Sequence, residues 1–148
     1  MVDPMSVLGL PDYNPGSLSL RETRIVYLHG ELRLDELEEE LLGQGRSLEE
    51  TARILSEQRN ALRSWTRELM SDRRAAATIT AENPNMSWDE VVAKYRNRGF
   101  TGDDLYREIM AAAKRSRAKV NEALGLDPNN PPPLPPMLPP VPFDRGPP

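Results

Sequence analysis

The chain has 148 residues, no cysteine, a single histidine and a formal net charge of -4 at pH 7. The absence of cysteine excludes disulfides, thiolate zinc sites and thiol nucleophiles. The lone His29 has no second histidine or cysteine with which to share a metal ion. We therefore expect no catalytic residue, no metal and no cofactor.

Four helix-start signals predict an all-α chain. In each, a hydroxyl residue precedes an acid by three positions: Ser19/Glu22, Ser47/Glu50, Ser87/Glu90 and Thr101/Asp104. The hydroxyl side chain can accept from the backbone N–H three residues on, while a glutamate reaches back to the backbone of the hydroxyl residue. The fourth pair is weaker because aspartate is the shorter acid. No strand pattern competes with these signals.

The predicted elements begin with an extended lead-in over residues 1–17, which contain three prolines and two glycines. Two helices over 20–42 and 48–70 follow, because apolar residues repeat every seven positions in both. The short turn at 43–45 favours an antiparallel helical hairpin. Its expected core residues are Leu34, Leu37, Leu41, Leu48, Leu55 and Leu62. A dimerising leucine zipper is the alternative.

Two or three shorter helices complete a helical domain over residues 18–126. The pattern predicts them at 72–81, 88–96 and 103–124. The last is expected to direct Leu105, Ile109, Ala113, Val120 and Leu124 inward, and Gly125 suits its C-terminal cap.

A proline-rich C-terminal tail occupies residues 127–148 and holds eleven of the 15 prolines. Such density favours polyproline II, and Pro132/Pro135 and Pro133/Pro136 match the PxxP pattern. Four apolar residues are candidate partner-binding residues in the tail: Leu134, Met137, Leu138 and Phe143. We expect the tail to bind a partner groove or its own domain, with disorder as the alternative.

Acidic and basic residues are concentrated in different parts of the chain. Residues 21–52 carry four arginines against nine acids, whereas residues 53–120 carry fourteen Lys and Arg against nine acids. Arg59, Arg63 and Arg67 are four apart and share one helix face, and like charges at this spacing repel unless they are offset. We expect this face to pair with the acidic first helix. Phosphate or nucleic acid is the alternative partner, and Lys114, Arg115 and Arg117 form a second candidate anion-binding segment.

Two resemblances bear on function. The segment Tyr27–Glu31 resembles the YxxxE pattern of actinobacterial type VII secretion substrates. Three segments, 59–72, 83–88 and 99–105, resemble helical domains near the C-terminal end of large actinobacterial secreted proteins of the polymorphic-toxin type. This second resemblance covers about residues 22–126 and implies a toxin-related or secretion setting, but it transfers no catalytic residue.

The sequence thus predicts a non-enzymatic helical protein–protein interaction module, or adaptor, with a proline-rich recruitment tail and a protein partner. The alternative is a small metal-independent ribonuclease-type toxin or nucleic-acid-binding domain that uses Arg59, Arg63 and Arg67. No apolar run reaches the length of a membrane span. The N-terminus lacks the basic-then-apolar order of a signal peptide, so we expect a cytoplasmic protein, with signal-independent export as the alternative.

Overall fold

The computed structural model describes residues 8–137 and is all-helical over this range, as predicted. The helices are α2 (Leu20–Gly43), α3 (Leu48–Leu69), α4 (Arg73–Glu82), α5 (Trp88–Asn97) and α6 (Gly102–Leu124). Within the described range the only strand-like pairing is an isolated bridge between Leu18 and Met70. None of these helices has the length and apolarity needed to cross a membrane.

The helix starts follow local side-chain chemistry, with two departures from the predicted boxes. Ser19 and Ser87 form complete capping boxes with the glutamates three residues on. Ser47 caps α3, but the Glu50 side chain pairs with Arg46 instead of returning to the cap. Thr101 occupies the cap position of α6 without making a side-chain cap bond, so the predicted Thr101 cap is wrong.

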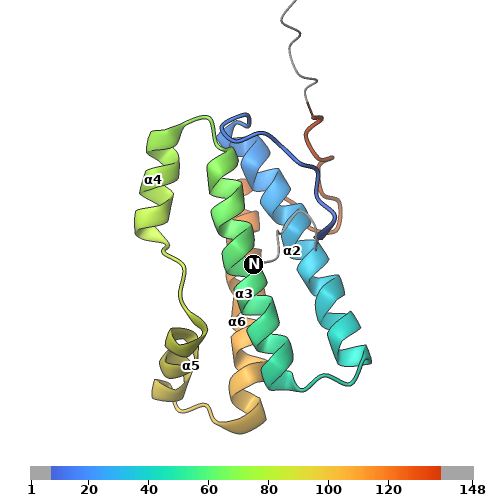
Figure 1. The fold of residues 1–148 in the computed structure, drawn as a ribbon, viewed down its shortest axis with the longest axis vertical. Coiled ribbons are helices and arrows are strands. Elements are labelled where there is room, and N and C mark those ends of the chain that lie inside the picture. The colour runs from blue at the N-terminus through green and yellow to red at the C-terminus, as the bar shows by residue number, and fades with distance from the viewer. Residues whose placement is uncertain (1–7, 138–148) are drawn as a thin grey trace, which may run out of the picture.

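The main core lies between α2 and α3, which run side by side along most of their length (Figure 1). Val26, Leu34, Leu55 and Leu62 are buried in it. Gly30 permits the close approach, because a Cβ atom added there would lie 2.6 Å from both terminal methyl carbons of Leu62. The seven-residue apolar repeat therefore marks a contact surface within the chain.

One position of the predicted core, Val120, is exposed, and so is Leu20 at the start of α2. Val120 is 45% exposed and Leu20 is 41% exposed. Both side chains line the cavity between α2, α3 and α6 that is described below. The prediction that Val120 is buried is wrong, because periodicity does not show where packed helices leave a space between them.

The segment before α2 belongs to the same core. Leu8, Leu10 and Tyr13 are buried against the α2 and α3 side chains. Backbone bonds from Gly16 N to Glu68 O and from Leu18 N to Leu69 O, both 2.8 Å, tie the segment to the end of α3. Residues 8–18 therefore act structurally as part of the helical domain.

Helix α5 packs against the start of α6 and forms a smaller cluster. Tyr95, Leu105 and Ile109 are buried there, and the rings of Trp88 and Tyr106 stack with centroids 6.2 Å apart. Figure 1 shows the α4–α5 connection running along α3, and Asn60 Nδ2 of α3 donates to the carbonyl of Met86 in it at 2.6 Å. The connection forms one wall of the site described below.

Ion pairs between helices account for part of the charge asymmetry. Lys114 Nζ of α6 lies 2.9 Å from Glu38 Oε2 of α2, and Arg117 Nη1 lies 3.0 Å from Asp35 Oδ1. The acidic α2 thus attracts the basic α6 through long side chains.

Candidate functional site

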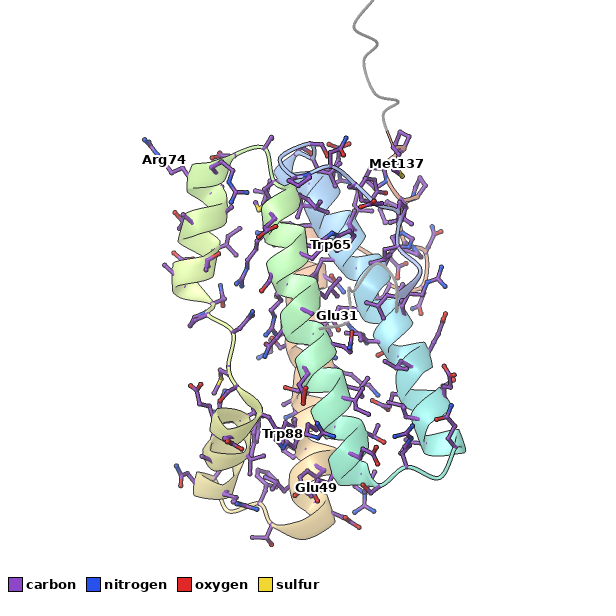
Figure 2. The ribbon with its side chains drawn as sticks, viewed as in Figure 1. Glu31, Glu49, Trp65, Arg74, Trp88 and Met137 are labelled. Carbon is purple, nitrogen blue, oxygen red and sulfur yellow. The ribbon has the colours of Figure 1, made fainter. Side chains whose placement is uncertain are left out.

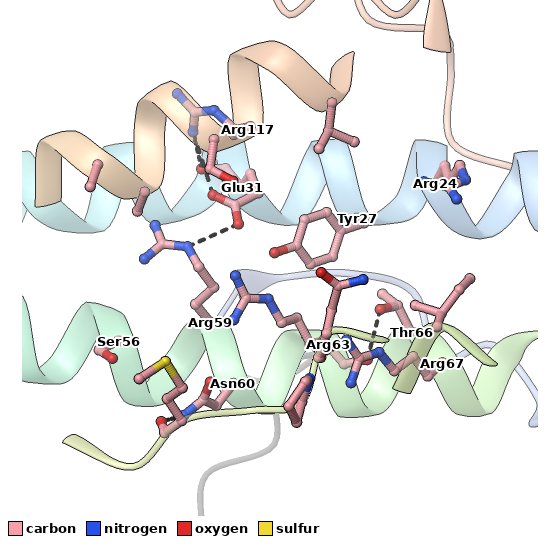
Figure 3. A pocket seen from close by; sticks show the side chains of 18 of the residues that line it. Arg24, Tyr27, Glu31, Ser56, Arg59, Asn60, Arg63, Thr66, Arg67 and Arg117 are labelled. Carbon is pink, nitrogen blue, oxygen red and sulfur yellow. Dashed lines mark hydrogen bonds and ion pairs between the residues drawn. The ribbon is translucent and has the colours of Figure 1, made fainter. Parts of the chain in front are cut away.

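A cavity of about 490 Å³ opens between α2, α3, α6 and the connection from α4 to α5. Figure 3 shows it with arginines from three helices around it. Six cationic side chains and one carboxylate line it: Arg24, Arg59, Arg63, Arg67, Lys94 and Arg117, with Glu31. We call this the arginine-lined cavity.

Helical spacing brings the lining residues together. Arg59, Arg63 and Arg67 lie one turn apart along α3 and project from one face. On α2, Arg24 and Glu31 are separated by two turns, with Tyr27 between them. The cavity is therefore a groove between two helix faces that α6 and the α4–α5 connection close off.

Glu31 is the buried anion of the site. Its side chain is 2% exposed, and Figure 2 places it near the middle of the bundle. Arg59 Nε lies 2.9 Å from Oε1, and Arg117 Nη1 lies 3.6 Å from Oε2. Among the described residues Oε2 accepts no hydrogen bond. Removing one partner of such a buried pair is costly because the remaining charge loses its compensation.

Arg117 joins α6 to this network. It donates to Asp35 Oδ1 at 3.0 Å and to the Glu31 carbonyl at 3.3 Å. Burial acts to lower the pKa of Arg117, but the hydrogen bond and charge of Asp35, with the charge of Glu31, raise it above its ordinary value. Arg59 and Arg117 are thus neutralised by α2 acids.

Three other arginines of the cavity are not neutralised in this way. Within residues 8–137, no carboxylate oxygen lies within 4.0 Å of the guanidinium groups of Arg24, Arg63 or Arg67. Arg67 Nη2 donates to the Asn83 carbonyl at 2.6 Å. Burial, together with the charge of Arg63, lowers the pKa of Arg67. The positive charge at this end of the cavity remains available to an anion.

Tyr27 lies between the neutralised and the uncompensated arginines (Figure 3). Burial, followed by the nearby Glu31 carboxylate, raises its pKa to about 12, although Arg63 and Arg59 oppose the shift. The phenol therefore stays protonated at neutral pH and acts as a hydrogen-bond donor, not as a base.

The remaining walls of the cavity are largely apolar. They include Met70, Ile79, Val91, Ile109 and Leu124. Apolar walls beside clustered guanidinium groups suit a ligand that carries both an anionic group and an apolar surface.

The structure divides the predicted anion-binding residues. Arg59, Arg63, Arg67 and Arg117 line the cavity. Lys114 lies outside it and pairs with Glu38, while Arg115 pairs with Glu108 on the surface of α6. The expectation that Arg59, Arg63 and Arg67 all pair with α2 acids holds for Arg59 alone. The second basic segment is not one surface, because Lys114 and Arg117 face α2 whereas Arg115 pairs with Glu108 of α6 itself.

Of the four predicted partner-binding residues of the tail, the two that the structure describes also lie in different surroundings. Leu134 packs against the main core, and Met137 is 52% exposed. Leu138 and Phe143 lie outside the described residues.

Sequence reasoning missed Glu31, Arg24 and Tyr27 as parts of a site. In the sequence Tyr27 and Glu31 belong to a YxxxE pattern, whereas the structure places both in the cavity and buries the Glu31 carboxylate. The available signal was their spacing with Arg24 along one face of α2. An acid on the buried face of a helix predicts a cationic partner.

Within residues 8–137, no group of three or more His, Asp or Glu side chains is placed to hold a metal ion.

The chain matches no protein-family model, and comparisons with curated proteins and with solved structures found no match.

Proposed function

We propose that this chain is a non-enzymatic helical binding module that engages an acidic segment of a protein partner in the arginine-lined cavity. The observation that carries the proposal is the presence of Arg24, Arg63 and Arg67 around the cavity without a carboxylate within 4.0 Å among the described residues. Their mutual repulsion would be relieved by a carboxylate of the partner.

The cavity walls favour a peptide over a polyanion. The cavity walls also include apolar side chains such as Ile79 and Val91, which fit the aliphatic parts of a peptide. Nucleic acid would need an extended basic surface. The net charge of -4 and the acidic α2 oppose close approach of a long polyanion.

Binding to a short peptide of alternating glutamate and leucine, labelled with fluorescein, tests the proposal by anisotropy. A matched peptide with lysine in place of glutamate is the control ligand. We expect Arg63→Gln to weaken binding by about tenfold or more, since hydrogen bonds to charged groups contribute about 1.5–3 kcal/mol. Arg53→Gln is the matched control on the same helix, because Arg53 pairs with Glu57 on the surface. Equal losses for both variants would contradict the proposal.

A ribonuclease or nucleic-acid-binding function that uses the face of Arg59, Arg63 and Arg67 is the second candidate, because all three arginines line the cavity. Incubation with total RNA tests it. Discrete cuts that disappear in Arg63→Ala would favour the ribonuclease and overturn the adaptor. RNA affinity that falls steeply with added salt, without cleavage, would favour a nucleic-acid-binding domain.

We further propose, on the sequence resemblance alone, that the module belongs to a secretion or toxin-related system. A neighbouring gene for an immunity protein or a secretion component would support this setting.

A further inference from the structure

The start of the proline-rich tail lies against the helical domain, on the opposite side of α2 and α3 from the arginine-lined cavity. Residues 131–137 run beside the N-terminal segment and α2 (Figure 1). The Tyr13 hydroxyl donates to the Pro135 carbonyl at 2.6 Å, and His29 Nε2 lies 2.7 Å from the Pro132 carbonyl. Side chains of the domain thus bind the backbone of the tail.

The spacing of these two contacts fits one kind of ligand. The accepting carbonyls belong to Pro132 and Pro135, which are three residues apart. Polyproline II has three residues per turn, so carbonyls at this spacing face the same side. A chain in that conformation has no internal hydrogen bonds, which leaves its carbonyls available to side-chain donors.

Between the two carbonyls an apolar side chain enters the domain. Leu134 packs against the core cluster that contains Leu10 and Tyr13, and Pro135 is buried. The rings of Tyr13 and Trp65 lie beside each other, with centroids 6.5 Å apart. We call the surface formed by Leu10, Tyr13, His29 and Trp65 the aromatic groove.

An aromatic groove with hydrogen-bond donors directed at carbonyls is the usual means of recognising proline-rich peptides. We propose that the aromatic groove is a receptor for polyproline II segments of the form Leu-Pro-Pro-apolar on a partner protein, and that the chain's own tail occupies it in cis. The tail then competes with the partner for the aromatic groove and lowers the apparent affinity of the partner.

The seated tail itself defines the chemistry of the ligand. Leu134-Pro135-Pro136-Met137 supplies the apolar anchor and one accepting carbonyl. The sequence repeats the pattern at once as Leu138-Pro139-Pro140-Val141. The proposal concerns a surface separate from the arginine-lined cavity and stands independently of the function proposed above.

The test uses the full chain and a fluorescent peptide with the sequence of residues 131–137. Leu134→Ala removes the apolar anchor of the tail and leaves every residue of the groove unchanged. We expect the peptide to bind this variant at least about tenfold more tightly than the wild-type chain, because a site blocked in cis has an apparent affinity reduced by its free fraction. Equal binding to both chains, or binding to neither, would overturn the proposal.

A second substitution assigns the site. Tyr13→Phe in the Leu134→Ala chain removes the donor to the carbonyl and is expected to weaken peptide binding about three- to tenfold. Tyr106→Phe is the matched control, since Tyr106 stacks on Trp88 in the other cluster. Equal effects of the two Tyr→Phe changes would contradict the assignment.

Two further measurements keep the test decisive. If Leu134→Ala does not fold, excess peptide is titrated into the otherwise wild-type chain carrying Trp88→Phe, which leaves Trp65 as its tryptophan. A saturable change in Trp65 fluorescence supports the proposal, and no change contradicts it. Concentration-dependent dimers in light scattering that Leu134→Ala abolishes would overturn the external partner and assign the groove to a second copy of the chain.

Discussion

Replacing the buried carboxylate of Glu31 by an amide tests the ion-pair network that shapes the arginine-lined cavity. Glu31→Gln keeps the size of the side chain but leaves Arg59 and the Glu31-facing side of Arg117 without their anion. Arg59 is 12% exposed and Arg117 is 15% exposed, so water screens these charges poorly. Breaking a buried pair costs about 3–5 kcal/mol. Because Asp35 still pairs with Arg117, we expect the lower end, about 3 kcal/mol.

Urea unfolding followed by circular dichroism measures this loss in the free energy of unfolding. In a thermal melt the same loss corresponds to a fall of about 6–12 °C in melting temperature for a domain of this size. Glu36→Gln on the same helix is the matched control. Its carboxylate is exposed and lies 3.9 Å from Arg33, so its removal should change the free energy of unfolding by no more than about 0.5 kcal/mol. A loss below about 0.5 kcal/mol for Glu31→Gln would refute the argument that Glu31 compensates two buried charges.

Three further predictions concern the core and the phenol. Leu55→Ala should lower the free energy of unfolding by about 2–5 kcal/mol in urea melts, because Leu55 is buried between α2 and α3; a loss below about 0.5 kcal/mol would contradict this. Gly30→Ala should cost about 1–3 kcal/mol in the same assay, since the added methyl group meets the buried Leu62; unchanged stability would show that Leu62 moves aside freely. The pKa of Tyr27 is raised from 10.0 to about 12, so folding favours the protonated phenol. The contribution of this phenol to the free energy of unfolding is therefore fully present below about pH 10 and is lost as pH rises through about 12. Over that interval wild type should lose about 2–3 kcal/mol more stability than Tyr27→Phe, and parallel pH profiles would refute the shift.

The helices could be predicted because their signals are local. Ser19 and Ser87 cap α2 and α5 through contacts with residues only three positions away in the sequence. The seven-residue apolar repeat follows from helix geometry. The cap at Ser47 shows the limit, because Glu50 has two possible partners and the neighbouring Arg46 takes it. Sequence spacing alone does not decide between two partners of similar reach.

The cavity was harder to predict because its parts are distant in sequence. The α3 arginines were visible as a column, but pairing Arg59 with Glu31 and leaving Arg63 unpaired depends on how the helices rotate against each other. Arg117 joins the site from α6, whereas Arg115, two positions before it, pairs with Glu108 on the surface. One residue step turns a side chain by about 100° around a helix. A basic segment therefore does not by itself define a basic surface.

The docking of the tail shows the same limit in another form. The PxxP match at Pro132 and Pro135 was weak evidence, since any proline run produces it. The structure gives these two residues a specific role, because Tyr13 and His29 meet their carbonyls from distant parts of the chain.

The central claim, that the uncompensated arginines of the cavity bind an acidic peptide, is tested most directly by heteronuclear NMR of the arginine side-chain N–H groups. The acidic glutamate–leucine peptide is titrated into the full chain, with the lysine peptide as control. We predict saturable shifts of the Arg63 and Arg67 signals, while the signal of the surface-paired Arg53 stays unchanged. Uniform shifts of all arginines, or shifts confined to residues outside the cavity, would contradict the claim.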